Sequence, residues 1–198
     1  MEQIPLELDK NGYQYLKGDS GLARMRFAYG TCLAVPREVF ECIGLFDERF
    51  FLQLEETDFH MRATDAGYGA ICDPSIKIFH KESRAFGGTR AAIKSYYMTR
   101  NTMLLIEKNH RGMVAKLNGF KQLYWILSRL AALTEGQSRL SVPGFLRWLA
   151  SRVPSASTVR AGIGGYLLRR FGKAPDGFRE QLSSAEKSYA PGLGKWAG

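Results

Sequence analysis

Three carboxylates within four positions, Glu55, Glu56 and Asp58, are the residues of this sequence best suited to acid–base chemistry. They stand at the expected start of a helix over residues 55–66, where the helix dipole stabilises negative charge, so a simple acidic helix start is one explanation. Asp58 precedes Arg62 by four residues, the order that favours an ion pair, and is expected to be paired within the helix. Adjacent helical residues point about 100° apart. We therefore expect Glu55 and Glu56 to face different surroundings, one structural and the other towards a cleft.

Two further residues have types suited to binding charged groups. His80 ends an expected strand over residues 76–80, where a histidine is either a polar residue satisfied by its neighbours or a ligand. Arg100 falls on the apolar stripe of a long helix expected over residues 90–109, so it must face inward. An inward arginine requires an anion, either a protein carboxylate or a substrate phosphate.

The elements that must position these residues follow from local patterns. Residues 26–35 alternate between larger side chains and small ones, which predicts a strand whose small face, Ala28, Gly30, Cys32 and Ala34, permits close approach of a ligand or of another backbone. A short helix is expected over residues 36–43, stopped by Gly44. The aromatic turn over residues 45–51 is expected mostly to pack in the core or within the turn, with the wall of a substrate site as its second role. Strands mixed with helices before residue 110, and helices alone after it, indicate an α/β body with a helical appendage.

The helical appendage is strongly basic. One apolar stripe repeats at helical spacing and predicts a helix, followed by a break near residues 134–144 and two shorter helices; its members are Met113, Leu117, Phe120, Tyr124, Leu127 and Ala131. Of the net charge of +9, residues 1–110 contribute 14 Lys and Arg against 15 Asp and Glu, and residues 111–198 contribute 14 against 4. Such a segment could meet the phosphates of nucleic acid or of anionic lipid.

Other features exclude several classes of protein. The three cysteines are unclustered, which argues against a disulfide framework or a zinc site and fits a reducing cytosol. No signal-peptide pattern follows Met1, and the longest apolar run, residues 123–127, is too short to cross a bilayer. No zinc-finger, RNA-recognition or helix-turn-helix pattern is present, so no nucleic-acid partner is expected.

The stretch from Gly44 to His80 resembles the family 2 glycosyltransferases, most closely their bacterial rhamnosyltransferase-like branch. That family usually has F-F-x-x-x-E-D-x-D followed by R, G-Y, P and H. The corresponding residues here are Phe50, Phe51, Glu55, Glu56, Asp58, Arg62, Gly67, Tyr68, Pro74 and His80. This chain departs from the pattern at Glu56, where the family usually has Asp. The resemblance is specific over residues 28–110 and weak in the tail.

The resemblance implies a fold and an activity. Residues 1–110 would form the acceptor-side, C-terminal part of an A-type glycosyltransferase fold, and residues 111–198 a basic helical tail. The implied reaction is an inverting transfer of a sugar from a nucleotide-sugar donor to a glycan or lipid-linked acceptor, in cell-surface polysaccharide synthesis. Glu56 would be the general base, with Glu55 as the alternative, and His80 would ligate a Mg or Mn ion on the donor diphosphate. The substrate-binding residues would be Gly30, Phe51, Asp58 and Arg100.

The chain is expected to lack the other half of such an enzyme. The 29 residues before Gly30 show neither an alternating strand–helix run nor a D-x-D motif. We therefore expect the isolated chain to be incomplete and inactive. It would be cytoplasmic, with possible peripheral attachment to an anionic membrane on its inner face. The alternative is a non-catalytic remnant or membrane-surface interaction module that keeps only the acceptor-side surface.

Overall fold

The computed structural model describes three short strands near the N-terminus and then residues 30–72, 76, 92–134, 136, 140–178 and 180–182. The chain forms two compact units. The first unit contains residues 1–47 and 55–81, and the second contains residues 48–54 and 82–198. The long helix that precedes residue 110 thus belongs with the tail, because it packs on the tail's last long helix.

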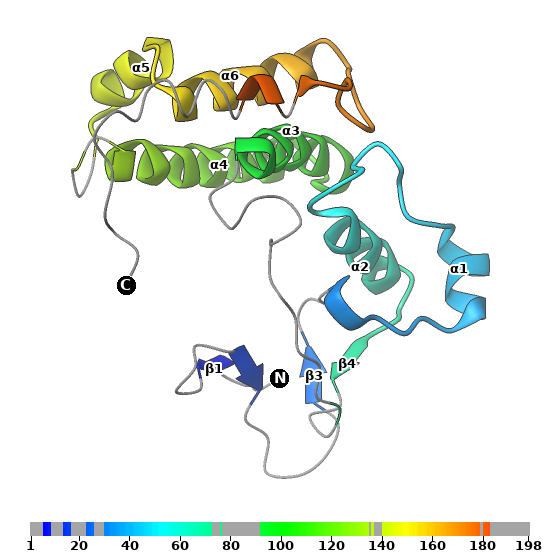
Figure 1. Cartoon of the computed structure of the whole chain (residues 1–198). Coiled ribbons are helices and arrows are strands. Elements are labelled where there is room, and N and C mark those ends of the chain that lie inside the picture. The colour runs from blue at the N-terminus through cyan, green and yellow to red at the C-terminus, as the bar shows by residue number, and fades with distance from the viewer. Residues whose placement is uncertain are drawn as a thin grey trace. The chain divides into compact units, whose positions relative to one another are not determined.

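The first unit combines short antiparallel strand pairs with two helices (Figure 1). Strand β1 (Leu6–Leu8) pairs with β2 (Gln14–Leu16), and β3 (Ala23–Met25) pairs with β4 (Ala70–Cys72). Between them lie the short 3-10 helix η1 (Gly30–Cys32), α1 (Arg37–Ile43) and α2 (Glu55–Asp65). Helix α1 ends at Gly44 and α2 is followed by Gly67, both with positive φ, as the sequence predicts.

The strand predicted over residues 26–35 is wrong where the structure describes it, since residues 30–32 form η1 and residues 33–36 are irregular. A strand needs a partner, and no described strand pairs with residues 30–35. The apolar alternation has another cause. Val35 packs against the core formed by Val39, Phe59 and Ala63, which joins α1 to α2.

The second unit is a two-layered helical body. Helix α3 (Ala92–Asn109) and α4 (Met113–Thr134) form one layer, and α5 (Val142–Ala150) and α6 (Pro154–Leu167) form the other (Figure 1). These helices confirm the predicted long helix, the stripe-bearing helix, the break and the two shorter helices. Ser141 caps α5 by accepting a hydrogen bond from the Gly144 N–H, which satisfies an otherwise free helix-end donor.

Glycines allow α3 and α6 to lie very close together. A Cβ atom on Gly162 would come within 2.8 Å of the Tyr96 carbonyl oxygen and the Thr99 Cβ. A Cβ atom on Gly165 would come within 2.9 Å of the Tyr96 hydroxyl. No larger residue fits this contact without moving a helix.

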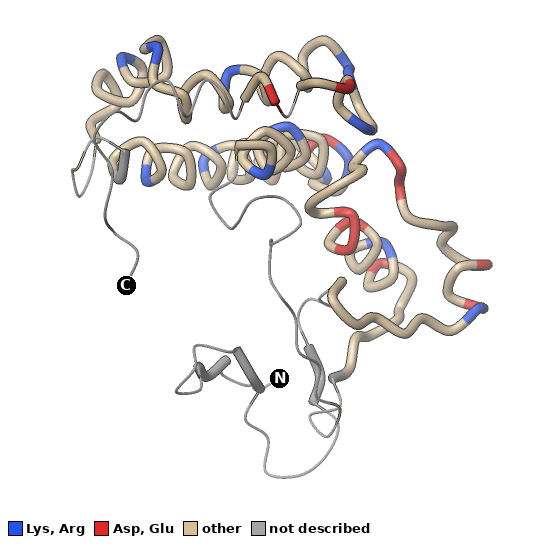
Figure 2. Tube along the Cα trace, in the orientation of Figure 1, with Lys and Arg blue, Asp and Glu red and all other residues tan. Residues whose placement is uncertain are grey.

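The two units carry different charges (Figure 2). Acidic residues occupy α1 and α2 in the first unit, whereas the sequences of α4, α5 and α6 contain Lys and Arg but no Asp or Glu. Among the described helices, none is both long enough and apolar enough to span a bilayer.

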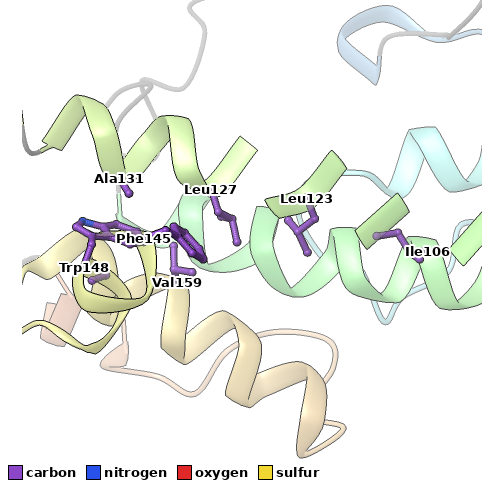
Figure 3. Packing of buried hydrophobic residues seen from close by; sticks show 8 residues of the cluster. Ile106, Leu123, Leu127, Ala131, Phe145, Trp148 and Val159 are labelled. Atoms are coloured by element: carbon purple, nitrogen blue, oxygen red, sulfur yellow. The ribbon is translucent and has the colours of Figure 1, made fainter. Parts of the chain in front are cut away.

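Side chains from α4, α5 and α6 meet in the main core of the second unit (Figure 3). Leu127 and Ala131 of α4 are buried in the same cluster as Phe145, Trp148 and Val159. The predicted apolar stripe of α4 is therefore split. Its C-terminal half is buried in this core, whereas Met113, Leu117 and Phe120 in its N-terminal half are exposed.

Candidate active site

The two adjacent glutamates at the start of α2 line one pocket in the first unit. The pocket has a volume of about 510 Å³, and its lining residues are Gly30, Leu33, Val35, Phe40, Phe46, Glu55 and Glu56. The expectation that the two carboxylates face different surroundings is wrong. Both belong to the first helical turn, where no preceding turn restricts the direction of the side chains, so both can reach the same side. The structure thus brings together Gly30, Glu55 and Glu56 from the predicted site.

Each of the two glutamates has one buried carboxylate oxygen without a hydrogen-bond partner among the described residues. Within the described part of the chain, neither Glu55 Oε2 nor Glu56 Oε2 has a hydrogen-bond partner, although both atoms are removed from solvent. A buried carboxylate oxygen without a partner is costly, so such atoms are rare in folded proteins unless a ligand or a function uses them. The two atoms are therefore available to a group that enters the pocket.

The environment of the pair favours a proton on Glu55. Burial raises the pKa of the Glu55 carboxyl above its usual value. Its own backbone N–H opposes this rise in pKa, and the Glu56 carboxyl adds to it through its charge and through a hydrogen bond to the protonated form. Two neighbouring carboxylates cannot both ionise easily, because the like charges repel each other in a poorly solvated site. Glu55 therefore holds its proton to a higher pH than an ordinary glutamate does.

The other two residues predicted near this pair have distinct positions. Gly30 lies against Glu56, since a Cβ atom on Gly30 would be 3.5 Å from the Glu56 Cγ. Asp58 is fully buried and accepts a hydrogen bond of 3.0 Å from Arg62 Nε, which confirms the predicted ion pair. Arg62 also donates to the carbonyl oxygens of Ile43 and Leu45. In this structure Asp58 thus orients an arginine that holds the chain after α1, and it does not line the pocket.

Arg100 and Phe51, the remaining substrate-binding predictions, belong to the second unit. Arg100 is fully buried, as its position on the helix predicts. Its five N–H groups donate to protein oxygens: Asn101 Oδ1 and the carbonyl oxygens of Arg49, Phe50, Arg170 and Gly172. The anion expected as its partner is replaced by these oxygens, with the rings of Tyr96 and Tyr97 within 5.5 Å of the guanidinium carbon.

Asn101 completes a clamp on the loop over residues 48–54. Its side-chain amide donates to the carbonyl oxygens of Phe50, Leu52 and Gln53 at 2.7–2.9 Å. The loop needs this support because three of its residues that are not glycine have positive φ: Phe51 at 57°, Gln53 at 70° and Leu54 at 71°. Phe51 is half exposed, and its ring centre lies 5.5 Å from that of Tyr97.

The predicted metal ligand lies outside the described residues. That residue is His80. Within the residues that are described, no three His, Cys, Asp or Glu side chains come together in a group that could hold a metal ion. The described residues by themselves do not fit a metal site.

Phe40 and Phe46 are pocket residues that the sequence did not assign as such. Phe46 stacks on Phe59 with ring centres 4.7 Å apart, and its ring meets Phe40 edge to face at 6.2 Å. The sequence feature that indicated Phe46 was the aromatic turn over residues 45–51. This turn was predicted mostly to pack in the core or within the turn, and secondly to form the wall of an acceptor site. Phe46 packs on Phe59 and also lines the pocket, and its role as an acceptor wall stays a prediction.

The pocket thus combines two carboxylates with an apolar, partly aromatic wall. Over part of its length the chain is similar to rhamnosyltransferases. It is 30% identical over 83 residues to the N-acetylglucosaminyl-diphospho-decaprenol L-rhamnosyltransferase of Mycobacterium tuberculosis, covering 42% of this chain and 27% of that protein. It is 32% identical over 83 residues to the dTDP-rhamnosyl transferase RfbF of Shigella flexneri, covering 38% of this chain and 28% of that protein.

These similarities are partial. The matched segment spans less than a third of the length of either relative. No protein-family model matches the chain, and no solved structure matches it. What the comparisons support is a glycosyltransferase-like function. The relatives' names describe a dTDP-linked sugar in one case and a lipid-diphosphate-linked acceptor in the other.

Proposed function

We propose that this chain is the acceptor-side portion of an inverting family 2 glycosyltransferase with an A-type fold. It would move a sugar from a nucleotide-sugar donor to a hydroxyl of a glycan or lipid-linked acceptor in cell-surface polysaccharide synthesis. The observation that carries the proposal is the Glu55–Glu56 pair, whose buried Oε2 atoms have no partner among the described residues and whose side chains line the pocket. The partial similarity to rhamnosyltransferases supports the same reaction class.

In the proposed reaction Glu56 is the general base. The acceptor oxygen forms a bond to the anomeric carbon of the donor while the bond from that carbon to the diphosphate oxygen breaks. The hydroxyl proton passes to Glu56 Oε2, and the nucleoside diphosphate leaves with the bonding electrons. A single displacement of this kind inverts the anomeric centre. Glu55 would limit the charge of the pair by holding a proton, because burial and Glu56 raise its pKa.

The apolar residues of the pocket fit the acceptor side of this reaction. Leu33, Val35, Phe40 and Phe46 surround the carboxylate pair with apolar surface. A sugar ring presents polarised C–H groups on one face, and the negative face of an aromatic ring attracts such groups. Phe46 would thus support the acceptor sugar while its hydroxyl approaches Glu56.

Metal dependence remains a proposal that rests on His80 and the resemblance. A Mg or Mn ion on the donor diphosphate would neutralise charge on the leaving group. The described residues offer no group of three potential ligands. We therefore assign no step of the reaction to a metal.

The location that fits a lipid-linked acceptor is the cytoplasmic face of a membrane, with the protein bound peripherally. The basic composition of α4, α5 and α6 supports this assignment, because cations are attracted to anionic lipid head groups.

Substitution of the two glutamates tests the function. In the chain completed with a nucleotide-sugar-binding half, Glu56→Gln should keep the fold and reduce turnover at least about a hundredfold, the usual contribution of a general base. Glu41→Gln is the matched control, because Glu41 is an exposed helical glutamate paired with Arg37. Near-normal turnover in Glu56→Gln combined with a large loss in Glu55→Gln would move the role to Glu55. No effect of either change would favour the non-catalytic alternative.

A further inference from the structure

The charge of the second unit is one-sided along a long stretch of sequence. Residues 108–175 contain twelve Lys and Arg and one acidic residue, Glu135. Helix α4 carries Lys116, Lys121 and Arg129 and no acidic residue. Lys121 and Arg129 are exposed in the structure. A surface with cations and no neighbouring carboxylates attracts anions rather than forming internal ion pairs.

The same helix exposes large apolar side chains. Between 39% and 73% of each of these side chains is accessible: Met113, Val114, Leu117, Phe120 and Trp125. Met113, Leu117 and Phe120 are spaced four and three residues apart and so follow one line along the helix, and Val114 and Trp125 follow the line beside it. Lys121 lies on that second line, between Val114 and Trp125. We call this group of five apolar residues the α4 face.

Packing within the second unit does not use the α4 face. The core takes Leu123, Leu127 and Ala131 from α4, and these are almost fully buried. At 100° per residue, the buried Leu127 and Ala131 lie within about 40° of Met113 and Phe120, whereas Val114 and Trp125 lie about 100–120° from Met113. Met113, Leu117 and Phe120 therefore continue the packed stripe of α4 towards its N-terminal end, where the stripe is exposed, and Val114 and Trp125 widen the exposed surface on one side.

The composition of the α4 face selects the kind of partner. An apolar strip that includes a tryptophan, with lysines whose long side chains can reach polar head groups, fits the interface of an anionic bilayer. A second copy of the chain fits poorly, because two opposed α4 faces would bring Lys121 and its symmetry mate together. Nucleic acid would meet the cations but would leave Met113, Val114 and Leu117 in water.

We propose that the α4 face is the membrane-docking surface of this protein and that it lies in the head-group region of an anionic bilayer. Helix α4 would lie parallel to the bilayer surface, with Trp125 and Leu117 inserted and Lys116 and Lys121 at the phosphates. The proposal deepens the peripheral location given above and rests on that part of the proposed function. It supplies a reason for a helix that presents apolar residues to solvent without being able to span a membrane.

Flotation of the 198-residue chain with lipid vesicles tests the docking surface. The chain should float with vesicles of phosphatidylcholine and phosphatidylglycerol at low salt and should not float with phosphatidylcholine alone. Binding should weaken as salt rises through about 0.1 M, where charges are screened within about 10 Å. Lys116→Gln and Lys121→Gln should each lower the partition coefficient about fivefold.

Paired substitutions separate the α4 face from apolar exposure in general. Leu117→Gln with Trp125→Gln should lower the partition coefficient at least about tenfold, since both side chains lose apolar burial. Leu45→Gln with Leu167→Gln is the matched control, because these leucines are at least as exposed as Leu117 but lie elsewhere. An equal loss in both pairs, or no flotation of the wild type at low salt, would overturn the proposal.

Two further measurements keep the test decisive. Brominated lipids should quench the tryptophan fluorescence of the wild type more strongly than that of Trp125→Phe, a mild change that spares the fold. Light scattering should show a monomer. A dimer that Leu117→Gln abolishes, found together with no vesicle binding, would show that a second copy of the chain covers the α4 face and would overturn membrane docking. Vesicle binding does not require sugar transfer, so loss of the proposed activity would leave this result unchanged.

Discussion

Glu55 and Glu56 are consecutive residues of α2, and each keeps one buried carboxylate oxygen that no described group hydrogen-bonds. Folding places both side chains in one pocket at the positive end of a helix. The dipole reduces the cost of negative charge there, while burial and the proximity of the two groups raise the pKa of Glu55. This combination favours a protonated Glu55 beside Glu56.

The raised pKa of Glu55 predicts a pH dependence of stability. In the unfolded chain this pKa has its ordinary value near 4.5, and in the folded state it is higher. The folded state therefore holds the proton over a pH range in which the unfolded chain has lost it, and this contribution to stability is lost as pH rises through the folded pKa. Glu55→Gln should raise the melting temperature at pH 7 and change it little below pH 4.5. Melting curves across this range, with Glu41→Gln as control, check the prediction; a gain that is the same at every pH would contradict it.

The aromatic wall predicts an effect on acceptor binding. Phe46→Ala should raise the KM for a soluble acceptor glycoside about fivefold, with a smaller change in kcat, because an aromatic contact of about 1 kcal/mol is lost. Phe120→Ala is the control, since Phe120 and Phe46 are 39% and 38% exposed. Phe51 is also predicted to bind substrate, and the KM of Phe51→Ala in the same assay tests that prediction. A fall in kcat with an unchanged KM in Phe46→Ala would give this ring another role.

The clamp on residues 48–54 predicts a loss of stability in the second unit. Asn101→Ala should lower the free energy of unfolding by about 1–3 kcal/mol, because buried carbonyl oxygens of the loop lose their donor. Asn118→Ala, at an exposed position of α4, should change it by less than about 0.5 kcal/mol. Chemical denaturation measures both. Similar values for the two variants would show that the strained loop does not depend on Asn101.

The contact between α3 and α6 predicts opposite effects at two nearby glycines. Gly162→Ala should destabilise the second unit by about 1–3 kcal/mol, because its Cβ would lie 2.8 Å from the backbone of α3. Gly164→Ala should be neutral or stabilising by up to about 1 kcal/mol, because no atom lies within 4 Å of its Cβ position and alanine favours the helix. Thermal or chemical unfolding of the two variants decides the point. Stabilisation by both would mean that the helices are further apart.

Local sequence was sufficient for the helices and for the pairs that form within them. Capping residues, stop glycines and apolar spacing predict α1, α2, α3 and α4 with small errors at their ends, because such signals act within a few residues. The ion pair between Asp58 and Arg62 follows from spacing alone, as does the inward direction of Arg100. The resemblance to family 2 glycosyltransferases rests on an ordered series of residues and so required no tertiary information.

Only the tertiary structure decided which groups meet. The strand predicted over residues 26–35 fails at residues 30–35, because a strand requires a pairing partner elsewhere in the chain and no described strand pairs with these residues. Periodicity showed that Arg100 is buried but could not show that its partners are carbonyl oxygens more than 45 residues away in sequence. A 100° rotation on a helical wheel separates Glu55 from Glu56, yet both enter one pocket, because side chains in the first turn have no preceding turn to direct them.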